Sequence, residues 1–179
     1  LGPIFPTALT GEPMDSGSHV AHFTLAGDGG FNVGVASAEQ DPNASEPAWI
    51  TPHGWGYGTQ SGKVWHRGTA MAGTPLQGHE PLPDGTVVTL LLDCDAGSLT
   101  LYLNGALQGV IVEAPKLASV GPLVWCCGMN ISGHSIQIER GTLPEESDEP
   151  EPARPADGTP EEGDLGVDDL DSMAMDLED

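Results

Sequence analysis

The clearest pattern of hydrophobic and polar positions lies in residues 84–110, which read DGTVVTLLLDCDAGSLTLYLNGALQGV. Residues 86–92 form a short apolar run rich in β-branched side chains, which is typical of a strand buried on both faces. After a polar turn, residues 98–104 place leucine at every second position. Asn104 and Gly105 tolerate the positive φ angles of a tight turn, so they end this second strand. The segment therefore predicts a pair of β-strands.

The rest of the chain before Pro144 has the same character, with short apolar segments separated by turns rich in Gly, Pro, Asn and Asp. No ten-residue stretch there has the spacing of an amphipathic helix. These short strands favour two packed antiparallel sheets or a barrel, with the long connections 37–53 and 69–83 on the rim. The predicted strands are residues 20–25, 31–36, 54–58, 64–66, 86–92, 98–103, 109–113, 123–128 and 135–139.

The composition changes near Pro144 and divides the chain. Residues 145–179 carry 15 of the 27 acidic residues, a single basic residue and no aromatic residue. We therefore expect an N-terminal lead-in at residues 1–15, a β-sandwich domain at 16–143, and an acidic, disordered tail at 144–179. Because the first residue is not Met, we also expect the chain to be a fragment or a processed form of a longer protein.

Part of the tail has a second interpretation. Leu170, Met173 and Leu177 recur at helical spacing among acidic residues within residues 164–179. This stretch is either a solvated acidic end or a short motif that folds into a hydrophobic groove of a partner. Both interpretations stay open.

The charge and the cysteines limit the partners and the compartment. Five Lys and Arg against 27 Asp and Glu, a formal net charge of −22, provide no basic stripe for phosphates, so we expect neither nucleic acid nor membrane as a partner. No apolar run approaches the roughly 20 residues of a spanning helix. The cysteines are odd in number, and the adjacent Cys126 and Cys127 point to opposite faces of a predicted strand. We therefore expect reduced thiols and an intracellular protein, cytoplasmic or nuclear.

Residues with catalytic or metal-binding chemistry do not form the sets that known sites require. Asp93 and Asp95 lack the E-x-D-x-x-E spacing of sandwich-type glycosidases, and with Gly97 they fit a turn whose side chains accept hydrogen bonds from backbone amides. A calcium loop would need a ligand at Gly97 and a glutamate at Asn104. Neither zinc-ligand spacing nor a G-x-S-x-G motif is present in the sequence. We expect no enzyme activity, no cofactor and no metal.

Several segments, in this order, resemble the SPRY domain, the core of the B30.2 family. They are GGFNVGVAS (29–37), GWGYGTQSGKVWHRG (54–68), the run at 84–110, GPLVWCCG (121–128) and SIQIERG (135–141). The most specific positions are Asp93, Asp95, Gly97, Leu99, Tyr102, Asn104 and Gly105. The resemblance covers about residues 16–141 and implies a bent, two-sheet antiparallel sandwich similar to the concanavalin A-type lectins. It also implies a non-catalytic protein-interaction module, of the kind that scaffolds and ubiquitin ligases use.

The resemblance implies that a partner peptide or surface meets rim loops at one edge of the sandwich, here residues 37–53, 69–83 and 127–133. An exposed Trp in the first of these loops would be a typical hot spot for binding. We expect Trp55 and Trp65 to be structural, in or near the core between the sheets. The candidate partner-binding residues are Trp49, His53, Tyr57, Gly128, Met129 and Asn130.

Two other functions remain as alternatives. The first is a carbohydrate-binding, lectin-like domain, although such lectins usually need a cluster of metal-binding Asp and Asn residues that is not legible here. The second makes the β-sandwich a structural spacer and the acidic tail the binding element. The sequence does not identify the partner, and it does not indicate an oligomeric state.

Overall fold

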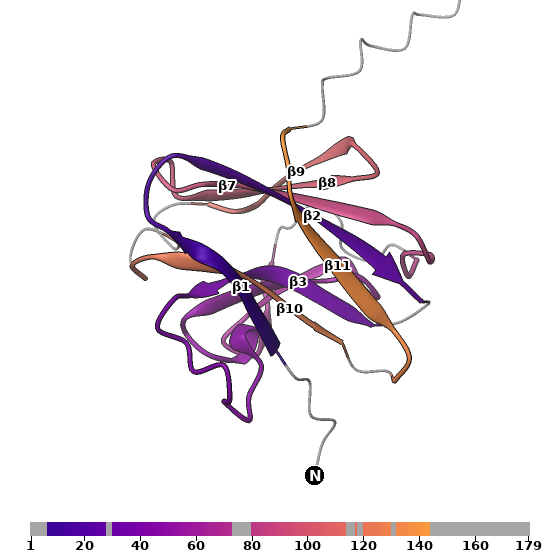
Figure 1. The fold of residues 1–179 in the computed structure, drawn as a ribbon, viewed down its shortest axis with the longest axis horizontal. Helices are drawn as coiled ribbons and strands as arrows, with labels where there is room; N and C mark the ends of the chain where they lie inside the picture. Colours follow the sequence, from indigo (N-terminus) through magenta and orange to yellow (C-terminus); the bar gives the residue numbers. More distant parts are fainter. Residues whose placement is uncertain are drawn as a thin grey trace, which may run out of the picture. The chain divides into compact units, whose positions relative to one another are not determined.

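Two antiparallel β-sheets form the protein in its computed structural model, which describes residues 7–27, 30–72, 80–113, 117, 120–129 and 132–143 (Figure 1). The six-stranded sheet has the order β1-β10-β3-β4-β5-β6, and the five-stranded sheet has the order β11-β2-β7-β8-β9. The elements are β1 (Thr7–Met14), β2 (Ser18–Ala26), β3 (Phe31–Ser37), η1 (Ala48–Ile50), β4 (Gly54–Gly58), β5 (Lys63–His66), β6 (Thr69–Ala70), β7 (Val87–Asp93), β8 (Ser98–Leu103), β9 (Ala106–Val112), β10 (Leu123–Met129) and β11 (Ser135–Arg140).

The structure confirms the predicted all-β sandwich, and each of the nine predicted strands is present within a few residues of its expected bounds. Two strands were not predicted. β1 pairs with β10 along the edge of its sheet, but most of its residues are exposed, so it has little hydrophobic signal. β6 has only two residues, which is too short for an alternation to be visible.

The core between the sheets is formed by the residues that alternate inward along each strand. Trp55 and Tyr57 of β4 are each 1% exposed, and Phe23 of β2 is fully buried opposite them in the same cluster. Trp125 of β10 makes an edge-to-face contact with Phe23, with ring centroids 6.0 Å apart. Such aromatic pairs add to the stability that burial of their area already provides.

Hydrogen bonds from backbone N–H groups to polar side chains fix the turns of the five-stranded sheet. Asn104 and Gly105 have φ angles of 48° and 84°, as a two-residue hairpin turn requires, and Asn104 Oδ1 accepts a hydrogen bond from Val87 N at 2.9 Å. Asp93 Oδ1 accepts one from Ala96 N at 2.8 Å, within its own turn. Asp95 differs, because its Oδ1 accepts a hydrogen bond at 3.1 Å from Gly17 N, which lies in the β1–β2 turn.

The outer face of β4 is bare of side chains, because this strand reads GWGYG. Its two aromatic residues point into the core, so its glycines face outward. A Cβ atom added at Gly56 would lie 3.1 Å from Trp49 of η1, and one added at Gly54 would lie 2.5 Å from the Ala48 carbonyl oxygen. The glycines thus allow η1 to pack directly on the strand backbone.

Candidate functional site

Of the predicted rim loops, 37–53 and 127–133 start from different ends of the six-stranded sheet. The register pairs Met129 with Phe31 at one end of β10 and Leu123 with Ser37 at the other. The connection 37–53 therefore leaves from the opposite end of the sheet to the connection that follows Met129. Since these loops start at different ends, the expected single surface built from 37–53 and 127–133 is not formed.

Trp49 is buried, contrary to the expectation of an exposed side chain in loop 37–53. It is 6% exposed and lies within η1, against Gly56. Its carbonyl oxygen accepts a hydrogen bond from Gly68 N at 3.1 Å, which holds η1 beside the β5–β6 turn. A partner cannot reach this ring without displacing η1, so Trp49 is a packing residue.

Tyr57 and Gly128 are also buried and do not offer a surface to a partner. Tyr57 is 1% exposed, and desolvation by burial raises the pKa of its phenol. Gly128 lies in the middle of the sheet, paired with Thr7 of β1 and Asn32 of β3. Tyr57 is buried because it points into the core between the sheets, and Gly128 is buried because β10 has a neighbouring strand on each side.

The remaining candidate residues are divided between the two ends of the sheet. His53 is exposed just before β4, and Met129 is partly buried against the core at the end of β10. Asn130 lies outside the described residues, as do Leu170, Met173 and Leu177 of the tail.

A cleft lies at the end of the six-stranded sheet where β10 finishes. It contains Trp65, the one tryptophan of the chain that is not buried. Trp65 of β5 is partly exposed on the outer face, where a Cβ atom added at Gly58 would lie 3.2 Å from its Nε1. The cleft, which we call the Trp65 cleft, has a volume of about 470 Å³. Its lining has no charged side chain and consists of Gly30, Phe31, Asn32, Gln60, Ser61, Trp65 and Pro81.

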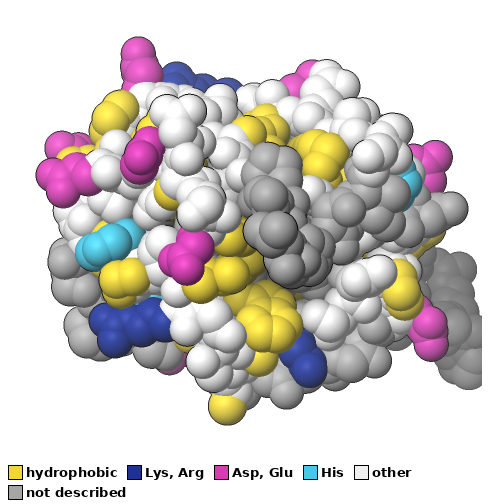
Figure 2. All heavy atoms as spheres, turned by 90° about the horizontal axis from the view of Figure 1, so that it is seen from below, with side chains coloured by type: hydrophobic (Ala, Val, Ile, Leu, Met, Phe, Trp, Pro, Cys, Tyr) yellow, Lys and Arg dark blue, Asp and Glu magenta, His cyan; other side chains and the backbone are white. Residues whose placement is uncertain are grey.

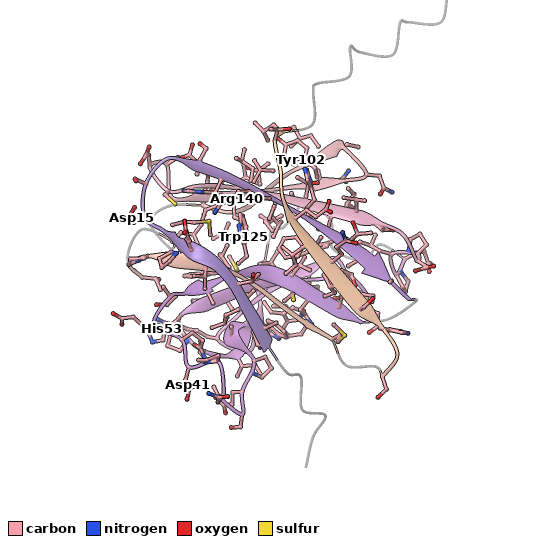
Figure 3. The ribbon with its side chains drawn as sticks, in the orientation of Figure 1. Asp15, Asp41, His53, Tyr102, Trp125 and Arg140 are labelled. Atoms are coloured by element: carbon pink, nitrogen blue, oxygen red, sulfur yellow. The ribbon has the colours of Figure 1, made fainter. Side chains whose placement is uncertain are left out.

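A second cleft, of about 370 Å³, lies at the opposite end of the sheet and is strongly polar. Glu39, Asp41 and His53 come from connection 37–53 or its end, and Arg67 comes from the β5–β6 turn. Asp41 and His53 lie on the same side of the molecule in Figure 3. Its mixed charges distinguish this cleft from the uncharged Trp65 cleft.

A third cleft, of about 290 Å³, lies beside Trp125 between the edge strands β1 and β11. The β1–β10 register shifts between Thr10 and Met14, and a Cβ atom added at Gly11 would lie 3.6 Å from the Trp125 ring. Arg140 lines the mouth of this cleft and lies near Trp125 in Figure 3. Trp125 is only 7% exposed, so the cleft offers little of its ring to a ligand.

The described cysteines are all free thiols. Cys127 belongs to the main core, whereas Cys126 belongs to a small cluster on the outer face. Burial raises the pKa of Cys127 to about 11, and burial followed by the charges of Asp95, Asp93 and Asp15 raises that of Cys94. A raised pKa keeps a thiol protonated and unreactive at neutral pH.

No cluster of three or more His, Cys, Asp or Glu side chains within the described part of the chain is arranged to hold a metal ion. None of the helices described is long and apolar enough to cross a membrane.

The protein is thus a two-sheet antiparallel β-sandwich with solvent-facing clefts at the ends of one sheet. The family model described as the SPRY domain matches residues 19–142, and the chain belongs to the SPRY family. SPRY domains are generally non-catalytic protein–protein interaction modules.

Two solved structures have the same fold. The SPRY domain of human HERC1 matches with a TM-score of 0.59 and 18% sequence identity over 76% of this chain and 82% of that chain. The TRIM65 PSpry domain matches with a TM-score of 0.57 and 18% identity over 76% of this chain and 72% of that chain. At these identities the likeness concerns the fold alone. No curated protein sequence matches this chain.

Sequence reasoning missed the Trp65 cleft and assigned Trp65 to the core region. A signal for it was present in KVWH at residues 63–66, because Val64 and Trp65 must point to opposite faces of a strand. Val64 is fully buried in the core, so Trp65 faces outward. Asn32 and Gln60 carried no comparable signal, since the fold alone brings them beside Trp65.

Proposed function

We propose that this SPRY domain binds a segment of a partner protein in the Trp65 cleft. The observation that carries the proposal is a partly exposed tryptophan within a cleft that has no charged lining residue. Tryptophan is among the residues that most often dominate binding energy at protein interfaces. Trp65 offers a large, rigid apolar surface whose position is fixed by the strand.

The polar groups around Trp65 suit a peptide backbone. Asn32 and Gln60 each offer a carboxamide donor and acceptor, and Ser61 offers a hydroxyl that can do both. A peptide in an extended conformation exposes unpaired N–H and C=O groups that such side chains can satisfy. We therefore expect an extended segment, with an apolar side chain against Trp65 and Pro81.

We also propose a cellular setting for this function. We infer a non-catalytic domain that brings a partner to a larger scaffold or ubiquitin-ligase-type protein. Two buried, unpaired cysteines support a reducing, intracellular compartment.

Affinity capture of partners from a cell extract with the full chain tests the proposal, using Trp65→Ala beside the parent protein. The matched control is Leu107→Ala, because Leu107 is 61% exposed on the other sheet. We expect the tryptophan variant to lose the partner and the leucine variant to keep it, with both variants folded by circular dichroism. Capture that is unchanged in Trp65→Ala would show that another surface binds.

Two further experiments with this protein test the alternative functions, a lectin-like domain and a spacer with a binding tail. Specific, competable binding on a glycan array in calcium would favour a lectin-like domain. Loss of all capture on deletion of residues 145–179, with Trp65→Ala unaffected, would favour a spacer with a binding tail.

A further inference from the structure

Two basic side chains flank Trp65 along β5 and its turn. Lys63 and Trp65 occupy outward positions on either side of the buried Val64, and Arg67 follows two residues later. We call Lys63, Trp65 and Arg67 the β5 strip. Figure 2 shows hydrophobic side chains between patches of Lys and Arg on this face of the molecule. Only one other described residue, Arg140, is a Lys or Arg, so the positive charge of an acidic domain is concentrated here.

The charges of the strip are not used inside the domain. Neither the Lys63 nor the Arg67 side chain forms a hydrogen bond or an ion pair within the described part of the chain. Glu39 and Asp41 line the same cleft as Arg67 but are not paired with it. Both cations are therefore available to an external carboxylate, although these two acids weaken the attraction at the Arg67 end.

The backbone of Arg67 is in a conformation that suits another residue better. Arg67 and Gly68 have φ angles of 52° and 69°, close to the 48° and 84° of the Asn104–Gly105 turn. The left-handed region is unfavourable for residues with a Cβ atom and is best tolerated by Gly and Asn. An asparagine would fit the turn at Arg67 at lower cost, so stability does not explain the arginine. Backbone strain of this kind is often retained at functional sites.

We propose that the β5 strip selects a partner segment in which an apolar side chain lies between two acidic side chains. This inference rests on the proposed function of the Trp65 cleft and specifies its ligand. Lys63 begins β5, and Arg67 is the first residue of the turn that follows His66, so the two cations stand at opposite ends of the strand, at most about 13 Å apart along the chain. An extended peptide spans that distance between positions i and i+4, so Asp-x-Leu-x-Asp places its leucine over Trp65. A polyphosphate is a poor alternative, because it has no apolar group to lie against Trp65.

The direct test measures binding of fluorescein-labelled GSDSLSDSG by fluorescence anisotropy in 50 mM salt. The matched peptides are GSNSLSNSG, without the charges, and GSDSSSDSG, without the leucine. We expect the acidic peptide to bind more tightly than either, and 500 mM salt to remove most of the difference. Equal binding of the Asp and Asn peptides would overturn the proposal.

Protein variants connect the effect to the strip. Lys63→Gln and Arg67→Asn are each expected to weaken the acidic peptide two- to fivefold, the usual range for one exposed ion pair. Arg140→Gln is the control and should bind like the parent protein. Glu39→Gln should strengthen binding by a similar factor. Arg67→Asn should also unfold at the same or a higher temperature, because it relieves the turn, so its loss of binding cannot come from unfolding.

The result separates this inference from the function on which it rests. If Trp65→Ala loses the captured partner while Lys63→Gln and Arg67→Asn bind every peptide like the parent protein, the Trp65 cleft stands and the acidic ligand is wrong. If capture does not depend on Trp65, the proposed function is wrong as well.

Discussion

The outer faces of the two sheets are built in different ways. On the six-stranded sheet the outward positions of β4 are glycines, and Trp49 of η1 lies on them and is buried. On the five-stranded sheet Leu91, Thr100 and Tyr102 point outward and are partly exposed. A strand with glycine at every second position needs a cover from elsewhere in the chain. A strand with ordinary alternation supplies its own outer surface.

The largest effect is expected when the Trp49 side chain, which covers the outer face of β4, is removed. Trp49→Ala should lower the free energy of unfolding by about 3–5 kcal/mol, the usual cost of truncating a buried tryptophan. Urea denaturation followed by circular dichroism measures the loss. A loss below roughly 1 kcal/mol would mean that η1 does not stabilise the sheet.

A smaller effect is expected when the bare strand receives a side chain. Gly56→Ala should cost roughly 1–3 kcal/mol, because its methyl group would press on the buried Trp49 ring at 3.1 Å. The cost should shrink in the Trp49→Ala background, where the ring is absent. A double-mutant cycle measures this coupling, and additive losses would show that the two residues do not meet.

The cysteines of β10 test whether both faces of the six-stranded sheet are dry. An unfolded thiol loses its proton near its ordinary pKa of 9.0, whereas Cys127 keeps its proton to about 11. Between these values the unfolded state binds fewer protons, so the free energy of unfolding should fall as pH rises, by about 1.4 kcal/mol per pH unit from this group. The pKa of Cys126 is also raised by burial, so it acts in the same direction.

Urea midpoints at pH 8, 9, 10 and 11 measure this dependence. Cys127→Ser should have a shallower slope above pH 9, whatever its stability at pH 8. Identical slopes for the two proteins would show that the inner thiol is accessible to water.

The smallest effect is expected on the five-stranded sheet. Leu107→Ser should change the free energy of unfolding by less than about 0.5 kcal/mol, because Leu107 is 61% exposed on the edge strand β9. Thermal melting of this variant beside Trp49→Ala compares the smallest and the largest expected losses of stability on the two outer faces. A large loss at Leu107 would mean that this face is covered in solution, as by a second copy of the chain.

The fold was largely predictable from the sequence, because alternation and turn residues carry the signal for strands. The run from 86 to 92, the alternating leucines after it and the Asn104–Gly105 turn are local features that the structure confirms. β1 was missed because its partner β10 is far away in the sequence, and pairing of edge residues leaves no hydrophobic pattern.

The site was much less predictable, because it depends on which face of a strand each residue occupies. Trp49 was expected on the surface from its polar neighbours, yet the glycines of β4 draw it inward. Trp65 was expected in or near the core, yet Val64 takes the inward position. For both tryptophans the deciding residue lies on a strand of the six-stranded sheet, so reading each strand face by face would have corrected them.

The position of β10 determines when the domain can form during synthesis. β1 has β10 as its neighbour in the sheet, and β3 lies between β10 and β4. The 108 residues between Met14 and Leu123 must therefore be translated before the ladder closes, which takes roughly 5–20 s at usual ribosomal rates. Until β10 is added, β1 and one edge of β3 lack the strand that pairs with them. Folding of this domain is thus a late event in translation, and a chain that stops before β10 has no route to the native sheet.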